Sequence, residues 1–184
     1  MIKVSIPAAA ALATSLPAPP VTKPILRATI GPPAAHHVEI RVDVAKQTIH
    51  LLSKGEIVKS WPVSTSQFGL GFEPGSFKTQ TGRFRIAEKI GDGALPWAAF
   101  KNRLPTGKMG SPDSGEDGVL TRILWIEGLD PENANTKDRF IYIHGTNQED
   151  RIGSPASHGC IRLRNSDVME LFSLVPAGTP LSIA

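Results

Sequence analysis

Hydrophobic and polar residues alternate along several short segments of the chain, which predicts a protein built mainly of β-strands. The alternation over 38–44 places the apolar side chains on one face, as in a strand with one buried side. Segments 47–52 and 57–64 flank a polar, glycine-containing turn at 53–56, and this arrangement is typical of a β-hairpin. Segment 83–90 alternates in the same way.

Two other segments, 120–126 and 140–143, are apolar at nearly every position, which indicates strands buried on both faces. The second leads directly into His144, beside a glycine, where a side chain can leave the sheet and face a cleft. Segment 179–183 is expected to close the sheet.

Only one segment has a clear helical pattern. Apolar residues between 168 and 175 recur with the i, i+3, i+4, i+7 spacing of a helix with one buried face. Asn165 or Ser166 is expected to cap its N-terminus, and a proline at 176 ends it. With six to eight strands beside this helix, the predicted fold is mainly β, a β-sandwich or partly closed barrel with one or two short helices.

Two long segments lack any periodicity. Segment 67–82 is rich in glycine and threonine, but no strand and helix flank it in the way a phosphate-binding loop requires, so we expect no nucleotide site. Segment 91–118 is rich in glycine and proline. A loop of that length in a compact domain usually carries function, and we expect it to form a flap over the site.

The 184 residues are enough for one domain with a sizeable core, expected at 36–184. Residues 1–35 differ from the rest, because they hold seven of the 16 prolines and no acidic residue. They are interpreted as a secretory leader, with Ala11-Leu12-Ala13 as a cleavage site, or as a Pro/Ala-rich linker. The two interpretations are compatible, since a leader can precede a linker.

The chain is mildly basic, with a formal net charge of +3. This charge suits an anionic polymer as a neighbour, but no basic cluster is interleaved with aromatic residues, so nucleic acid is not an expected partner. No apolar run is long enough to span a bilayer, so no transmembrane segment is predicted.

Cys160 is the single cysteine of the chain and the centre of its candidate chemistry. His158 precedes it by two residues and Arg162 follows it by two, and positive charge near a thiol is expected to lower its pKa from about 8.5. Gly159 leaves the backbone beside the sulfur open to a substrate carbonyl. A lone cysteine is also often just a small buried hydrophobic residue, so this pattern alone leaves both interpretations open.

A wider set of motifs resembles the L,D-transpeptidase (YkuD) family of bacterial cell-wall enzymes. The sequence reads I-H-G-T-N at 143–147 and S-H-G-C-I-R at 157–162. W-P-V-S-T-S at 61–66, T-G-R-F at 81–84 and V-P-A-G-T at 175–179 resemble other parts of the family. The resemblance covers roughly residues 37–184 and implies a β-rich fold.

The resemblance implies acyl transfer on peptidoglycan stem peptides in the cell envelope, outside the cytoplasm. Cys160 would attack a tetrapeptide, release its terminal D-alanine and hold the rest as a thioester. An amine of a second stem would then take the acyl group and form a cross-link. No metal or cofactor is needed, and carbapenem-type β-lactams are expected to acylate Cys160.

The resemblance also distributes roles among the residues around the cysteine. It favours His144 as the base, oriented by a backbone carbonyl near Gly145, with His158 shaping the pocket. The N–H groups of Gly159 and Cys160 are candidates for the oxyanion hole.

The chemistry of two other residues of the motif predicts their roles. Arg162 has two possible roles, a contact with a substrate carboxylate or a salt bridge within the sheet. Ser157 is expected to make local hydrogen bonds that shape the loop.

Other functions remain compatible with these residues. Water in place of the amine would make the protein an L,D-carboxypeptidase or a related peptidoglycan hydrolase. His144, His158 and Cys160 could instead be ligands of a metal-binding module, although a fourth ligand is not evident. A catalytically silent cell-wall-binding module is the third alternative.

Overall fold

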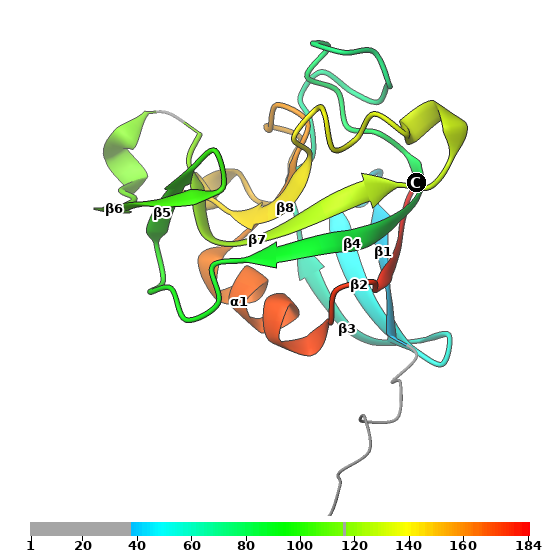
Figure 1. The fold of residues 1–184 in the computed structure, drawn as a ribbon, viewed down its shortest axis with the longest axis horizontal. Helices are drawn as coiled ribbons and strands as arrows, with labels where there is room; N and C mark the ends of the chain where they lie inside the picture. The colour runs from blue at the N-terminus through cyan, green and yellow to red at the C-terminus, as the bar shows by residue number, and fades with distance from the viewer. Residues whose placement is uncertain (1–37, 116) are drawn as a thin grey trace, which may run out of the picture. The chain divides into compact units, whose positions relative to one another are not determined.

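The computed structural model describes residues 38–115 and 117–184, so the predictions made for residues 1–35 lie outside the described residues. The described residues form a mainly β fold with one mixed ten-stranded sheet and one α-helix (Figure 1). The elements are β1 (Val38–Asp43), β2 (Thr48–Ser53), β3 (Glu56–Pro62), β4 (Gly82–Ile90), β5 (Ala98–Lys101), β6 (Leu104–Met109), β7 (Val119–Gly128), β8 (Tyr142–Gly145), β9 (Ile161–Leu163), α1 (Asn165–Leu174) and β10 (Pro180–Ile183). Three short 3-10 helices interrupt the loops, at Pro112–Ser114, Pro131–Asn133 and Glu149–Arg151.

The strands expected from alternation are present. β1, β2 and β3 are antiparallel neighbours, and the β2–β3 turn consists of Lys54 and Gly55, with φ angles of 53° and 82°. Positive φ at both positions is the geometry of a tight hairpin turn, which the glycine favours. β10 pairs in parallel with β1 and antiparallel with β4, so the last strand joins the first half of the sheet to the second.

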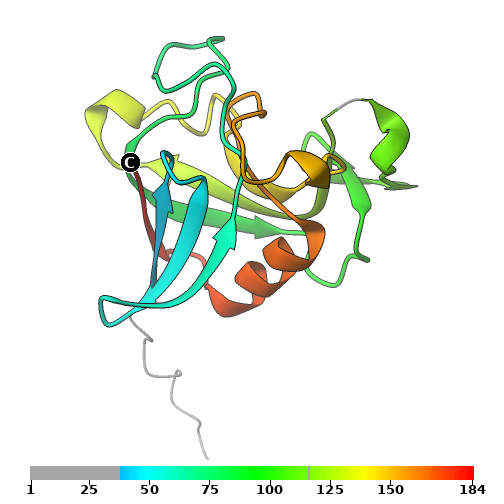
Figure 2. The ribbon, with the colours of Figure 1, turned by 180° about the vertical axis from the view of Figure 1, so that it is seen from behind.

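Strand β7 connects the rest of the sheet to the strands of the candidate site. It pairs with β4 and β5 in different parts of its length and with β8 as well. β8 in turn pairs in parallel with the short strand β9. Figure 2 shows α1 lying across these strands, and contacts of α1 with β7 and β8 agree with this arrangement.

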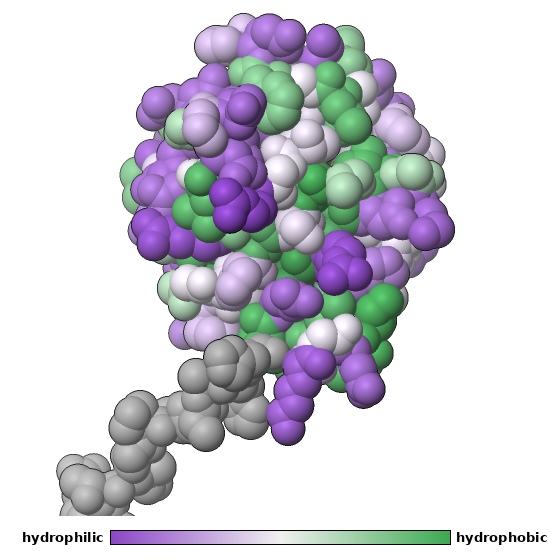
Figure 3. Space-filling model, turned by 90° about the vertical axis from the view of Figure 1, so that its right-hand side faces the viewer, coloured by the Kyte–Doolittle hydropathy of each residue, from purple (hydrophilic) through white to green (hydrophobic). Residues whose placement is uncertain are grey.

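The main core lies between the sheet and α1. Its fully or nearly fully buried side chains come from all parts of the sheet and include Ile40, Val42, Trp61, Phe84, Ile126, Ile143, Ile161, Val168, Leu171 and Leu181. The i, i+3, i+4 spacing that predicted the helix therefore marks the face that is buried. At the surface seen in Figure 3, hydrophobic and hydrophilic side chains are interspersed. Among the described residues, no helix is both long and apolar enough to cross a bilayer.

The predicted cap of α1 was wrong. Arg164 is the N-cap residue and makes no side-chain capping bond, while Asn165 is already the first helical residue. Glu149 supplies the capping group from a distant loop, because its Oε1 accepts hydrogen bonds from the backbone N and the Nδ2 of Asn165, each at 2.7 Å. A carboxylate at this position also complements the positive end of the helix dipole.

Segment 91–118 is not the structureless loop that was predicted. It contains the antiparallel hairpin β5–β6, whose two-residue turn is Asn102 and Arg103. All six residues of β6 are exposed, so the strand has no buried face and leaves no alternation in the sequence. Strand β9 was also not predicted, since three residues are too short for a periodicity.

Candidate active site

The register of β8 and β9 brings the predicted nucleophile and base together. The parallel pairing aligns Ile143 with Ile161, and both side chains are fully buried in the core. Because side chains alternate along a strand, His144 and Cys160 both point to the opposite face. Cys160 lies one position before Ile161, and His144 one position after Ile143, so the two are diagonal neighbours across the β8–β9 pair.

The thiol of Cys160 sits between a backbone group at the start of β8 and one of the segment just before it. Cys160 is half-buried, and its Sγ accepts a hydrogen bond from the backbone N–H of Tyr142 at 3.3 Å. The S–H points to the carbonyl oxygen of Phe140 at 3.5 Å. These two contacts hold the sulfur beside β8 and therefore fix its position relative to His144.

Surrounding protein raises the pKa of the Cys160 thiol from 9.0 to about 12. Loss of hydration is the main cause, and the negative charge of Asp117 adds to it. The N–H of Tyr142 and the charges of Arg162 and Arg139 act in the opposite direction without reversing the shift. The net shift of this pKa is therefore opposite to the expectation, because burial outweighs the neighbouring positive charges. The thiol is neutral at pH 7, so an attack by its sulfur would need a base.

His144 has the protonation state that a base requires. Its side chain is buried, and burial is the main cause that lowers its pKa, with Asp117 opposing that shift. Nδ1 lies 2.8 Å from the carbonyl oxygen of Gly145, the type of contact that was expected for this histidine. A carbonyl oxygen only accepts hydrogen bonds, so Nδ1 carries the proton, and Nε2 of the neutral ring is left to accept one.

Two residues, Gly145 and Thr121, shape the backbone around His144, and sequence reasoning missed the second of them. Gly145 has no room for a side chain, because a Cβ there would lie 2.4 Å from Asn165 Oδ1 and 2.9 Å from Leu120 O. Thr121 has a φ of 69°, which is unusual for a β-branched residue, and lies where the β7–β8 register shifts. Its Oγ1 donates a hydrogen bond to Asn165 Oδ1. The sequence gives no sign of this strained position, since a threonine within a strand is ordinary.

Arg162 takes the second of the two roles that were considered for it. Its side chain is 0% exposed and forms a salt bridge from Nη1 to Asp117 Oδ1 at 2.9 Å. The same Nη1 donates to Gln148 Oε1 at 2.8 Å, and Nη2 donates to Ser64 Oγ at 2.9 Å. A direct contact with a substrate carboxylate is therefore wrong for this structure, because no atom of the guanidinium reaches solvent. The Arg162–Asp117 salt bridge instead holds one positive and one negative charge beside His144.

The loop before Cys160 is shaped by Ser157, as expected. Its hydroxyl donates to the carbonyl oxygen of Cys160 at 2.6 Å and accepts from the N–H of Gly159 at 3.2 Å. Gly159 has a φ of 116°, and a Cβ at this position would lie 3.0 Å from Ile141 Cδ1. Since the Gly159 N–H already has an acceptor, the N–H of Cys160 is the stronger of the two candidates for an oxyanion donor.

His158 lies on the surface side of the nucleophile loop. Its ring is 5.6 Å from that of Phe68 and 5.7 Å from that of Phe77, and it borders a small depression of about 160 Å³ together with Arg139. This placement suits a residue that shapes the pocket. In residues 38–115 and 117–184, no three His, Cys, Asp or Glu side chains converge as metal ligands, which removes the geometric basis of the metal-binding alternative.

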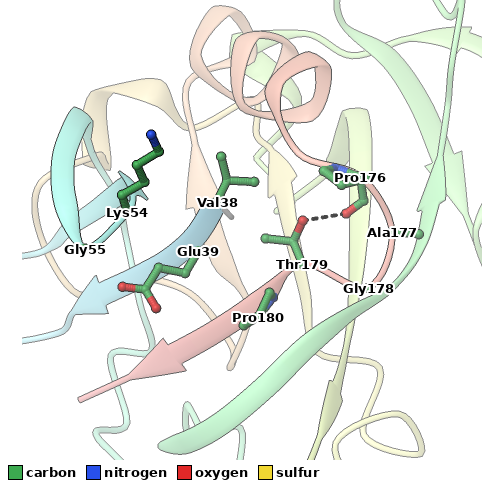
Figure 4. Close-up of a pocket in the computed structure, with 9 residues that line it drawn as sticks. All are labelled: Val38, Glu39, Lys54, Gly55, Pro176, Ala177, Gly178, Thr179 and Pro180. Atoms are coloured by element: carbon green, nitrogen blue, oxygen red, sulfur yellow. Dashed lines mark hydrogen bonds between the residues drawn. The ribbon is translucent and has the colours of Figure 1, made fainter. Parts of the chain in front are cut away.

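Two larger cavities differ in their relation to this site. One of about 790 Å³ lies between the β5–β6 hairpin and the start of β7, and Asp117 is part of its wall. Through Asp117 it reaches the charge pair beside His144. A second, of about 480 Å³, contains none of the site residues (Figure 4). It is lined by Val38, Glu39, Lys54, Gly55 and residues 176–180.

Comparison with known proteins shows the family to which the chain belongs. The model of the L,D-transpeptidase catalytic domain (YkuD) matches residues 37–183, and the chain therefore belongs to this family. The YkuD protein of Bacillus licheniformis, which carries a provisional L,D-transpeptidase name, is 29% identical over 146 residues, 78% of this chain and 64% of that protein. YkuD of Bacillus subtilis is 27% identical over 144 residues, again 78% of this chain and 64% of that protein.

Solved structures of L,D-transpeptidases share the fold, which confirms the predicted fold class. The enzyme of Xylanimonas cellulosilytica has a TM-score of 0.55 at 18% identity, covering 83% of this chain and 63% of that one. LdtMt1 in complex with imipenem has a TM-score of 0.52 at 18% identity, covering 81% of this chain and 59% of that one. The chain thus spans less than two thirds of the length of these relatives.

Proposed function

We propose that the protein is a peptidoglycan L,D-transpeptidase that uses Cys160 as its nucleophile. The observation that carries this proposal is the shared face of His144 and Cys160, on which a neutral thiol faces a histidine with an unprotonated Nε2. A neutral cysteine–histidine pair suits attack on an amide carbonyl, because the base removes the proton as the sulfur attacks.

The first half of the reaction acylates the enzyme. Nε2 of His144 takes the proton of Cys160, and the sulfur bonds to the carbonyl carbon between the third residue and the terminal D-alanine of a stem tetrapeptide. The oxyanion that forms accepts a hydrogen bond from the N–H of Cys160. The protonated His144 then gives its proton to the leaving amine, so D-alanine departs and a thioester remains. Asp117, which favours the charged form of His144, stabilises the imidazolium between these steps.

The second half returns the enzyme to its starting state. An amine of a second stem peptide attacks the thioester, loses its proton to His144 and forms a new amide, while the proton passes back to the sulfur. One amide bond is broken and one is made, so no oxidant, metal or nucleotide is required.

Two further properties belong to this proposal. The substrate lies outside the cytoplasm, so we place the protein in the cell envelope, and fractionation of producing cells would test that placement. LdtMt1 has been solved with imipenem, and the tuberculosis L,D-transpeptidase 3 with a faropenem-derived adduct. We expect the same class of compounds to acylate Cys160 in this protein.

Incubation with purified muropeptides, followed by mass spectrometry of the products, tests the activity. The proposal predicts cross-linked dimers and free D-alanine. Tripeptides without dimers would make the protein an L,D-carboxypeptidase, and cleavage of cross-links already present in the muropeptides would make it a hydrolase. Unchanged muropeptides with a folded protein would contradict all three activities.

A further inference from the structure

A cluster of two cations on one aromatic ring lies beside the nucleophile. The guanidinium carbon of Arg103 is 4.3 Å from the centre of the Trp125 ring, and Nζ of Lys137 is 4.5 Å from the same centre. Trp125 in turn packs edge-on against Tyr142, with 6.0 Å between the ring centres. We call Arg103, Lys137, Trp125 and Tyr142 the Trp125 cluster.

The cluster reaches the reacting sulfur through Tyr142 and Phe140. The backbone N–H of Tyr142 donates to Cys160 Sγ, and the carbonyl oxygen of Phe140 faces the same sulfur. The guanidinium of Arg103 lies 5.4 Å from the Phe140 ring, which is 53% exposed. A ligand group held by Arg103 would therefore lie beside the two residues whose backbone groups contact the thiol.

The cluster is rich in hydrogen-bond donors and has no anionic acceptor. Within the described residues neither Arg103 nor Lys137 forms a salt bridge, and Nε1 of Trp125 is buried without an acceptor. Nη1 of Arg103 donates to the hydroxyl oxygen of Tyr142 at 3.2 Å, which leaves the hydroxyl proton free to donate in turn. Two like charges near one ring repel each other, and an anion between them would relieve that repulsion.

The guanidinium of Arg139, another cation near the thiol, already has acceptors for its hydrogen bonds. Arg139 donates to the carbonyl oxygens of Gly71 and Lys78, at 3.1 and 2.8 Å, and to Ser76 Oγ at 3.2 Å. It supports the loop beside His158. The guanidinium of Arg139 is therefore committed to this loop, whereas that of Arg103 donates to the Tyr142 hydroxyl.

Arg103 occupies a turn position whose backbone conformation is unfavourable for a residue with a long side chain. Asn102 and Arg103 have φ angles of 51° and 67°, the left-handed conformation that a two-residue hairpin turn needs at both positions. Glycine is the favoured residue at the second of these, and an arginine there is strained. Strain in a residue that carries a charge toward a nucleophile is typical of a functional position.

We propose that the Trp125 cluster, led by Arg103 on the β5–β6 hairpin, binds a carboxylate of the substrate beside the scissile amide. This rests on the proposed function, since a stem tetrapeptide carries two carboxylates near that bond. One is the terminus of the departing D-alanine, and the other can be on the side chain of the diamino acid. A guanidinium binds either through two parallel hydrogen bonds.

Alkylation of Cys160 tests the cluster without any stem peptide. Iodoacetate and iodoacetamide both form a bond from sulfur to carbon and expel iodide, but only iodoacetate carries a carboxylate. The key variant is Arg103→Gly, which removes the guanidinium and introduces a residue that suits the conformation of the turn. Lys101→Gln is the matched control, because it removes one positive charge from an exposed side chain of the same hairpin.

We expect Arg103→Gly to lower the ratio of the iodoacetate to the iodoacetamide rate about 10-fold, the effect of losing a charge-assisted hydrogen bond. Lys137→Gln should lower it less, and Lys101→Gln should leave it unchanged. Equal ratios in the native protein and Arg103→Gly would overturn the proposal, as would an equal drop in Lys101→Gln. This readout holds whether or not the protein cross-links peptides.

Modified tetrapeptides then identify the carboxylate. The two substrates carry a carboxamide in place of either the D-alanine carboxylate or the diamino-acid carboxylate, and kcat/KM for thioester formation is measured with the native protein and Arg103→Gly. If Arg103 binds a given carboxylate, replacing that carboxylate or introducing Arg103→Gly should each lower kcat/KM about 10-fold. The variant acting on the modified substrate should show no further loss. Fully additive losses with both substrates would contradict the assignment.

Discussion

At the scale of single residues, the motif predicts Cys160 as nucleophile and His144 as base, but their protonation states follow only from the structure. The two were predicted from the His…Ser-His-Gly-Cys pattern, and the β8–β9 register places them on one face. The thiol pKa was predicted in the wrong direction, because burial depends on residues distant in sequence. Arg162 was ambiguous for the same reason, since its partner Asp117 lies 45 positions away.

The raised thiol pKa changes the expected pH dependence of the base. His144→Ala should slow the alkylation of Cys160 by iodoacetamide about 10²–10⁴-fold at pH 7, the usual effect of losing a general base. The rate of the variant should then rise about 10-fold per pH unit, in step with the thiolate fraction, and level off only near pH 12, where hydroxide forms the thiolate unaided.

His158→Ala is the control for this experiment. Its ring packs against two phenylalanines, so its loss should lower the rate with little dependence on pH. Rates from intact-mass spectrometry over a pH series would report both variants. A deficit of His144→Ala that stays constant over the pH series, or a pH-dependent recovery confined to His158→Ala, would contradict the assignment of the base.

At the scale of secondary-structure elements, periodicity predicted the strands that have a buried face and missed the strand that has none. β1, β2, β4 and β7 were found because their apolar residues face the core. β6 is exposed along its whole length, so its hairpin was taken for a loop. The helix was placed correctly, but its cap comes from Glu149, 16 residues before Asn165, which local sequence rules cannot detect.

Capping by Glu149 gives a prediction about stability. Glu149→Ala removes the acceptor for the backbone N–H and the amide of Asn165, and we expect it to lower the free energy of unfolding by about 1–2 kcal/mol. Ser166→Ala should change it by no more than about 0.5 kcal/mol, since the Ser166 hydroxyl bonds only to Asp167. Urea titration of both variants would check this, and a larger loss for Ser166→Ala would refute the capping assignment.

At the scale of the whole molecule, the buried His144 links folding to pH. Burial lowers its pKa, so the folded protein keeps the ring neutral at pH values where the unfolded chain binds a proton, below about 6.5. The unfolded state then holds more protons, and stability falls as pH decreases.

We therefore expect the free energy of unfolding to fall between pH 7 and pH 5 by up to about 1.4 kcal/mol per unit from this residue. His144→Gln should remove that part of the slope. Urea titrations at several pH values would measure the difference between the two proteins. Parallel slopes in the native protein and the variant would show that His144 does not titrate on unfolding.

The central claim is that Cys160 carries the acyl group during catalysis, and mass measurement of the intact protein tests it most directly. The folded protein is mixed with a donor tetrapeptide, without an acceptor, and quenched in acid. We predict an added mass equal to the tetrapeptide less D-alanine, removable by hydroxylamine as a thioester, and no added mass on folded Cys160→Ala. Release of D-alanine by Cys160→Ala, or an adduct on that variant, would contradict the claim.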